Sequence, residues 1–426
     1  MRLVSAALVA TLLLAGGCAD DPSPEPDNPA ATSAARAAAD LDLLLDRLET
    51  IHPEPFHSIR REEWVGELGD LQDRLPELSP EEAVVEVMRL VALLSREGRD
   101  GHQFALPQAG HEAPMLPLRL YFFEDEGRDD LVVTDAMPPY DDLVGGTVTE
   151  FGGVPVEELL AMTEPLVPRD GPTTVRSFQP QFVLRTEVLR GLGLMTGDTV
   201  PVTVEQDGSE SEHDLAPVSF DEHEAWAGWL GVIRLPERDD TRYVRDYDEV
   251  LTWERRGSAL YVRVTEIRMQ PDPPLERAAR DRALDRLVLD LRQNPGGDNT
   301  NNPAMVDLVS EFQERHPGAA VVVITDRVTF SAASNLTTDL ERLVDPVFVG
   351  EPMGGGLNFW NDVTWVHLDR LPVPMQVGVS TGYWQQAADP DDPRLTIEPD
   401  LPVTVEAEDY FAGRDPTLDA ALGELP

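Results

Sequence analysis

Apolar residues recur at two different spacings along the chain. Between residues 34 and 94 they return every three or four positions, which predicts amphipathic helices, the last of them starting at Ser79-Pro80. From Met115 to Val218 the pattern changes to short apolar runs separated by turns, one of them at Asp207-Gly208. The chain therefore predicts a helical N-terminal part followed by a small β domain.

The C-terminal part contains two near-continuous apolar runs, Leu287–Leu291 and Val321–Ile324. Such runs are typical of parallel strands that are buried on both faces. The stretch Asn302–Gln313 between them has helical periodicity, so the three segments predict a right-handed βαβ unit. We therefore expect a C-terminal mixed α/β domain and, for the whole chain, a multidomain protein of the α/β (α+β) class.

Ser331 lies where the second of these strands gives way to a helix. Beyond the polar residues 325–327, apolar residues recur at helical spacing, namely Ala332, Ala333, Leu336, Leu340 and Leu343. A serine at this place usually caps the helix by accepting from the free N–H groups of its first turn. The same place also presents a hydroxyl beside backbone donors and the positive end of the helix dipole, as a nucleophile requires. Spacing alone leaves both interpretations open.

A Pro-Gly-Gly turn follows the first of the two strands. Gly296 and Gly297 allow backbone N–H groups to approach a ligand closely, as an oxyanion hole requires, although an ordinary loop can contain the same residues. A third glycine run, Gly354-Gly355-Gly356, is not followed by Lys-Ser/Thr and therefore does not match a phosphate-binding loop.

Three sequence blocks in this order together resemble the S41 family of serine peptidases. They are LVLDLRQNPGG, TFSAASNLTTDLE and FVGEPMGGGLNFWND. The resemblance runs from about Leu41 to the C-terminus and includes Asp100-Gly101-His102, which matches a D-G-H element that follows an N-terminal helical bundle in the family. The stretch from Leu143 to Leu160 resembles a PDZ-like repeat, a module that binds an extended peptide at a sheet edge. The resemblance implies a C-terminal catalytic domain of the ClpP/crotonase-like type.

The resemblance also implies catalytic roles. Many S41 peptidases use a serine–lysine dyad, but this sequence contains no lysine, and arginine stays protonated at any useful pH. We therefore expect Ser331 as the nucleophile and His102 as the general base, since imidazole is the usual base near pH 7. Backbone N–H groups of Ala332 and of Gly296 or Gly297 are expected to bind the oxyanion.

Two further expectations concern the surroundings of this pair. A carboxylate should orient the imidazole; we expect Glu398 in this role, with Asp392 as the second choice. Gly354, Gly355 and Asn358 are expected to line the substrate cleft as a mobile wall.

No cofactor or metal ion is expected. His52 and His57 lie between two predicted helices, and no cysteine or further histidine joins them, so we interpret them as part of a helix–helix connection. Asp221-Glu-His-Glu224 is interpreted as a solvated run of charges.

The N-terminus has the pattern of a targeting segment. Arg2 precedes the apolar run Leu3–Ala15, which is too short for a stable membrane span. Small residues then precede Cys18, the only cysteine, and resemble a bacterial lipobox. A lone cysteine can also be a buried hydrophobe, but at this place we expect it to be lipidated. The protein is therefore expected to be extracytoplasmic, in the periplasm or at the cell surface, and anchored to a membrane through lipid.

Charge narrows the choice of partners. The formal net charge of −45 makes the surface repel nucleic acid, which we therefore exclude as a partner. We expect a protein or peptide substrate and a serine endopeptidase activity. The competing hypothesis is a catalytically inactive protein of the same fold that binds apolar ligands or peptides; the coexistence of Ser331 and His102 favours the enzyme.

These observations divide the chain into six parts. They are a lipoprotein signal peptide (1–18), a flexible tether (19–33), a helical domain (34–112), a PDZ-like β domain (113–220), a linker or covering segment (221–256) and the catalytic domain (257–426).

Overall fold

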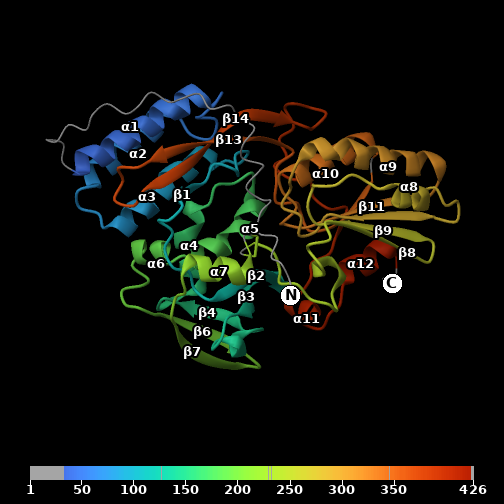
Figure 1. The fold of residues 1–426 in the computed structure, drawn as a ribbon, viewed down its shortest axis with the longest axis horizontal. Coiled ribbons are helices and arrows are strands. Elements are labelled where there is room, and N and C mark those ends of the chain that lie inside the picture. The colour runs from blue at the N-terminus through green and yellow to red at the C-terminus, as the bar shows by residue number, and fades with distance from the viewer. Residues whose placement is uncertain (1–32, 126, 229, 232, 345, 424–426) are drawn as a thin grey trace, which may run out of the picture.

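The computed structural model describes residues 33–423 except 126, 229, 232 and 345. The expected signal segment, Cys18 and nearly all of the tether lie outside these residues. None of the helices in the described part of the chain is long and apolar enough to cross a bilayer. The chain forms a mixed α/β structure with three sheets, as the sequence predicts (Figure 1).

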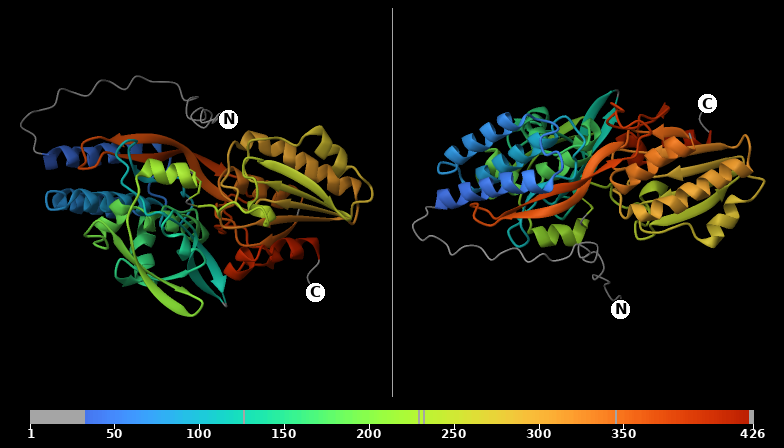
Figure 2. Two further views of the ribbon diagram at one scale, coloured as in Figure 1. Left: turned by 60° about the horizontal axis from the view of Figure 1, so that its bottom comes forward. Right: turned by 90° about the horizontal axis from the view of Figure 1, so that it is seen from above.

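The N-terminal helices pack against a small sheet to which the C-terminal part of the chain contributes. The helices are α1 (Ser33–Ile51), α2 (Arg61–Arg74) and α3 (Pro80–Ala92), and α3 starts with a capping box at Ser79. The sheet has the order β1 (Ala105–Pro107), β14 (Met375–Gln385), β13 (Asn358–Leu368). The long β13–β14 hairpin runs from the C-terminal sheet to the side of α1 (Figure 2). The sequence division at residue 257 therefore does not separate two independent folding units.

The second sheet forms the central β domain. Its order is β2-β3-β4-β6-β7, with β5 paired to β4; the strands are Leu118–Asp125, Arg128–Ala136, Thr147–Phe151, Val154–Pro155 (β5), Val200–Gln206 and Ser209–Leu215. The turn between β6 and β7 is Asp207-Gly208, and both residues have positive φ, as a tight hairpin turn requires. Three helices are inserted before β6: α4 (Val156–Thr163), α5 (Pro172–Val183) and α6 (Thr186–Gly191).

Residues 221–256, the expected linker or covering segment, contain most of a helix that packs on the β domain and one strand of the third sheet. Helix α7 (Phe220–Ala227) buries His223, whose Nε2 lies 3.3 Å from the carbonyl oxygen of Leu118. Strand β8 (Leu251–Arg256) pairs with β9 (Ala259–Val264) and forms the edge of the third sheet. The expectation of a solvated charge run at Asp221–Glu224 is therefore wrong for His223, because one face of the helix packs on the β domain.

The third sheet contains the predicted βαβ unit. Its order is β15-β12-β11-β10-β9-β8, with β10 (Arg286–Asp290), β11 (Ala320–Thr325), β12 (Val347–Gly350) and β15 (Leu401–Pro402). Strands β10 and β11 are parallel neighbours, and the helix between them, α9 (Asn302–Arg315), is present as predicted.

Helices cover both faces of this sheet, which explains the continuous apolar runs. Leu287 and Leu289 pack with α8 (Pro273–Ala279), α9 and α10 (Ala332–Leu343), whereas Val288 and Val322 pack with α12 (Pro416–Leu422). Figure 1 shows α8, α9 and α10 on one side and α12 on the other. The short helix α11 (Ala407–Phe411) lies near β2.

Candidate active site

Ser331 stands in a strained turn between β11 and α10. Its φ and ψ are 54° and −122°, a conformation that residues with a side chain rarely adopt. The side chain makes no capping hydrogen bond, so the interpretation of Ser331 as a helix cap is wrong. The backbone N–H of Ala332, the first residue of α10, has no acceptor among the described residues. The turn thus presents a hydroxyl and a free donor side by side.

The polar residues before Ser331 hold this turn. The buried carboxylate of Asp326 accepts from the backbone N–H groups of Val328 and Thr329, at 2.9 and 3.1 Å. The backbone N–H of Phe330 donates to the carbonyl of Asn294, at 3.0 Å, in the loop that contains the Pro-Gly-Gly turn. The two loops that follow β10 and β11 are therefore joined directly beneath Ser331.

The Pro-Gly-Gly turn lies against Ser331, as the oxyanion expectation requires. A Cβ on Gly296 would lie 2.7 Å from the Cβ of Ser331 and 2.9 Å from the backbone nitrogen of Ala332. The N–H of Gly296, however, donates to Oδ1 of Asn294 at 3.0 Å. The N–H of Gly297 has no acceptor within the described part of the chain. Of the three expected oxyanion donors, the N–H groups of Gly297 and Ala332 are thus the two that have no acceptor among the described residues.

His102 lines the same cavity as Ser331, but its ring makes no hydrogen bond to the described residues. Its ring stacks on Phe330, with ring centroids 4.5 Å apart, and on Phe359, at 5.6 Å. Both ring nitrogens are buried and lack a hydrogen-bond partner among the described residues. Burial lowers the pKa of His102 to about 4, against a smaller opposing effect of Asp100. The imidazole is therefore neutral at pH 7, which is the form that a general base needs.

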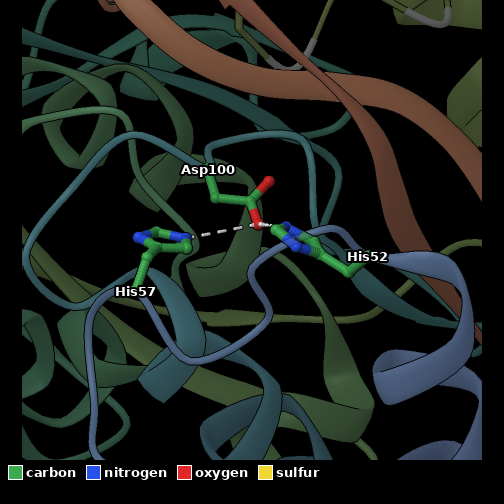
Figure 3. A group of neighbouring side chains, drawn as sticks. All are labelled: His52, His57 and Asp100. Carbon is green, nitrogen blue, oxygen red and sulfur yellow. Dashed lines mark hydrogen bonds and ion pairs between the residues drawn. The ribbon is translucent and has the colours of Figure 1, made fainter.

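Asp100 anchors the turn that carries His102. Its buried carboxylate accepts from Ser380 at 2.7 Å and from Gln103 at 3.0 Å, and Nε2 of His52 lies 3.2 Å from it. Nε2 of His57 points at the same carboxylate from 3.7 Å (Figure 3). Burial alone would raise the pKa of Asp100, but the interactions of its carboxylate with His52, His57 and Ser380 hold the pKa below its usual value.

The structure thus brings together a set of residues with the chemistry of metal ligands. Their ligand atoms in His52, His57 and Asp100 lie within 4.8 Å of one another. A metal-bound imidazole normally donates its other N–H to an acceptor. Nδ1 of His52 instead accepts from the backbone N–H of Glu54, at 2.9 Å. Its proton is therefore on Nε2, which points at Asp100. This hydrogen bond argues against a metal ion and for a network that fixes Asp100.

Asp170 joins the His102 turn to the glycine run before β13. Its carboxylate accepts from the N–H of Gly101 at 2.7 Å and from that of Gly356 at 3.1 Å. Burial raises the pKa of Asp170 to about 7, partly offset by these two hydrogen bonds. The unfolded chain, by contrast, titrates near the ordinary value of 3.8.

Stability is therefore expected to fall as the pH rises from about 4 to about 7. In this window the unfolded Asp170 loses its proton while the folded one keeps it, which favours unfolding by up to about 4 kcal/mol. The free energy of unfolding of Asp170→Asn, measured with denaturant, should not show this decrease between about pH 4 and about pH 7. The exposed Asp391→Asn serves as the control and should keep it. An unchanged slope in Asp170→Asn would contradict the role of Asp170.

A cavity of ≈ 330 Å³ opens beside Ser331 and His102. Such a volume is at the lower end of the range for ligand sites in proteins. Its wall is mainly apolar, with Phe104, Leu106, Phe178, Leu230, Ile233 and Phe330. The cavity lies between the helical part, the β domain and the C-terminal sheet, since all three contribute residues.

Neither expected carboxylate lies at His102. Glu398 is exposed, and Asp392 pairs with Arg394 at 2.8 Å; neither lines the cavity. Since both ring nitrogens of His102 are without a hydrogen-bond partner, none of the carboxylates in the described part of the chain orients the ring. The structure therefore does not support the expected role of Glu398.

Gly354, Gly355 and Asn358 are packed inside the protein rather than on a mobile cleft wall. The N–H groups of both glycines donate to the carbonyl of Thr329, and a Cβ on Gly355 would lie 2.0 Å from Oγ of Ser334. Oδ1 of Asn358 accepts from the backbone N–H groups of Gln386 and Ala387. Glycine is needed at position 355 because the loop packs closely on α10, and at position 354 because a Cβ there would lie 2.0 Å from the carbonyl oxygen of Arg327. This corrects the cleft expectation.

Several residues at the site could not be predicted from the sequence. Asp170 and Ser380 stand in no motif and reach the site only through the fold. The spacing of His52 and His57 suggested a possible site, but their carboxylate partner, Asp100, lies in a different part of the sequence.

The fold and the site define a multidomain α/β protein with a serine at a strained strand-to-helix turn. No family model matches the chain, and no curated protein sequence matches it either. Solved structures of CPAF have a similar fold. Mature CPAF complexed with lactacystin superposes with a TM-score of 0.62 at 12% identity, covering 92% of this chain and 98% of that chain. A CPAF mutant superposes with a TM-score of 0.63 at 12% identity, covering 91% and 97%. At this identity the likeness concerns the fold.

Proposed function

We propose that this protein is a serine peptidase of the S41 type in which Ser331 is the nucleophile. The observation that carries the proposal is the conformation of Ser331. Its backbone has positive φ, and its hydroxyl makes no capping hydrogen bond and lies at the wall of a cavity. Strained backbone of this kind is expensive and persists mainly where function needs it. The fold shared with CPAF supports the proposal.

The proposed reaction is acyl transfer through Ser331. His102 takes the hydroxyl proton as the Ser331 oxygen bonds to the peptide carbonyl carbon, and the N–H groups of Ala332 and Gly297 bind the resulting oxyanion. His102 then gives the proton to the leaving amine as the C–N bond breaks. Water, activated by the same imidazole, releases the acyl group and restores the serine.

This mechanism requires the His102 ring to turn. Neither ring nitrogen lies within hydrogen-bond reach of Ser331 here, because the ring is stacked between Phe330 and Phe359. Catalytic hydrogen bonds are often long in structures without substrate and shorten when it binds. The hydrogen bonds on Asp100 hold the neighbouring residue of the same turn, so the proposed movement is confined to the His102 side chain.

A fluorophosphonate probe tests the nucleophile. We expect the purified protein to be labelled at Ser331, as located by mass spectrometry, and Ser331→Ala to remain unlabelled. Ser209→Ala removes an exposed serine and should label as the wild type does. A folded wild type that stays unlabelled would contradict the proposal.

One alternative function has an observation in its favour. The unpartnered nitrogens of His102 and the apolar cavity also suit a catalytically inactive protein that binds an apolar ligand or peptide. The same labelling experiment separates the two, because such a protein would hold Ser331 without activating it.

We also propose an extracytoplasmic location for this protein. Extracytoplasmic anchoring through a lipid on Cys18 concerns residues outside the described range and stays a prediction.

A further inference from the structure

Gln293, like Ser331, has a strained backbone conformation. It opens the loop of residues 293–297, which follows β10 and ends in the Pro-Gly-Gly turn, and its φ is 59°. Ser331 follows the neighbouring parallel strand β11 and has a φ of 54°. A residue with a side chain keeps positive φ only where its surroundings enforce it. The contacts that enforce it at Gln293 therefore bear on the geometry of the adjacent site.

The side chain of Gln293 joins two segments that are far apart in the sequence. Its Oε1 accepts from the backbone N–H of Leu235 at 2.7 Å, and its Nε2 donates to Oδ2 of Asp326 at 2.6 Å. Asp326 is the carboxylate that holds the turn before Ser331. Gln293 is fully buried, so removal of its amide leaves the N–H of Leu235 without this acceptor.

The backbone of Gln293 is held from the same two sides. Its N–H donates to both carboxylate oxygens of Asp326, each at 3.1 Å, and its carbonyl accepts from Nε of Arg234 at 2.8 Å. Arg234 is itself buried and also donates to the carbonyl of Thr265. Every polar group of Gln293 thus has a partner, and together these partners enforce its positive φ.

The rest of the loop connects Gln293 to the expected oxyanion donor. The side chain of Asn294 donates to a carbonyl of β9 at 2.8 Å and accepts from the N–H of Gly296 at 3.0 Å. The carbonyl of Gly296 accepts from the N–H of Ile267 at 2.7 Å. Gly297, whose N–H has no acceptor among the described residues, comes next. A change of φ at Gln293 would turn these residues, because φ sets the direction of the chain that follows.

Gln293 does not touch the space in which a substrate would lie. It is absent from the wall of the cavity beside Ser331, whereas Leu230 and Ile233, which precede Leu235 in the same segment, line that cavity. Any effect of Gln293 on the reaction is therefore exerted through the residues that it holds.

We propose that Gln293 is a positioning residue that directs the N–H of Gly297 toward the oxyanion. It does so by joining the Ser331 turn to the segment that ends at Leu235, and the proposal rests on the proposed peptidase function. The oxyanion forms only when the Ser331 oxygen bonds to the carbonyl carbon. A displaced donor therefore weakens binding of the transition state and leaves binding of the substrate unchanged.

Steady-state kinetics of Gln293→Met tests this role. Methionine has a similar length and removes both side-chain hydrogen bonds. We expect kcat for a short chromogenic peptide to fall about 10–100-fold with KM within about twofold of the wild type, since a small displacement of a catalytic group has effects of this size. Thermal unfolding confirms the fold. A raised KM at unchanged kcat, or no change in either, would overturn the proposal.

Two further variants complete the kinetic test. Gln293→Gly also lacks the amide but accepts positive φ without strain, so it replaces Gln293→Met if that variant does not fold, and kcat should fall here too. Asp207→Gly is the matched control: it removes another side chain at positive φ, in the exposed β6–β7 turn, and should leave kcat unchanged. An equal loss of kcat in Asp207→Gly would contradict a specific role for Gln293.

A pair of inhibitors measures the binding of the oxyanion separately. With N-acetyl-Ala-Ala-leucinal, the Ser331 oxygen bonds to the aldehyde carbon, the C=O π pair moves to the oxygen, and His102 takes the hydroxyl proton. N-acetyl-Ala-Ala-leucinol cannot react in this way. The wild type should bind the aldehyde about 100-fold or more tightly than the alcohol. Gln293→Met should reduce this preference by about the factor by which kcat falls, while its affinity for the alcohol stays unchanged.

The outcomes separate this proposal from the proposed function. A wild type that is neither labelled at Ser331 nor selective for the aldehyde contradicts the proposed function, and the role of Gln293 with it. A wild type that is labelled and selective, with the same selectivity in Gln293→Met, contradicts the role of Gln293 alone.

Discussion

Ser331→Ala is expected to lower kcat for peptide hydrolysis by about 10⁴–10⁶-fold. The side chain lost is the group that would form the acyl intermediate, and the strained turn has no second hydroxyl in its place. The neighbouring Ser334 cannot substitute, because it is buried and donates to the carbonyl of Thr329. Residual activity above the water reaction would come from the donors at Ala332 and Gly297 and from substrate binding.

His102→Ala is expected to lower kcat by nearly as much as Ser331→Ala does. The double variant Ser331→Ala/His102→Ala should lower kcat little more than either single change. A nucleophile and its base act as one unit, so their effects on kcat do not add. Steady-state kinetics on a short chromogenic peptide, with thermal unfolding to confirm the fold, measures all three variants. His213→Ala, which removes a histidine away from the cavity, is the control. Activity of His102→Ala close to the wild type would exclude His102 as the base.

Arg327→Met is expected to lower the free energy of unfolding by about 3–5 kcal/mol. Arg327 is 1% exposed; its Nε and Nη2 each donate to Glu351 at 2.8 Å, and its Nη1 donates to the carbonyl of Phe122 at 2.7 Å. It lies between β11 and the Ser331 turn and thereby connects the C-terminal sheet to β2. Without it, the carboxylate of Glu351 is buried and unpaired.

The double variant Arg327→Met/Glu351→Leu distinguishes the effect of an unpaired buried charge on stability from the effect of altered packing. Because it removes both charges, it should lose much less stability than Arg327→Met in urea unfolding. Arg342→Met breaks an exposed ion pair with Asp339 and should change the free energy of unfolding by less than about 1 kcal/mol. A loss that small for Arg327→Met as well would contradict the role of the buried pair.

The sequence alone determined those elements whose structure depends on residues that are close together in the chain. The continuous apolar runs at residues 287–291 and 321–324 predicted the parallel strands, and the periodicity between them predicted α9. The capping box at Ser79 and the hairpin turn at Asp207-Gly208 were likewise readable, because both depend on residues within three positions of each other. Ser331 could be located at the strand-to-helix turn for the same reason, but its spacing could not distinguish a cap from an exposed hydroxyl.

Only the tertiary structure decided which distant groups meet. Ser380 reaches Asp100 across 280 residues because the β13–β14 hairpin leaves the C-terminal sheet and pairs with β1. No local pattern encodes that path, so the choice of Glu398 rested on resemblance and failed to place a carboxylate at His102. The neutral state of His102 and the raised pKa of Asp170 also depend on burial, which is a property of the assembled fold. Short-range periodicity thus determined where the reactive residues stand in their elements, while packing between elements determined their contacts and charges.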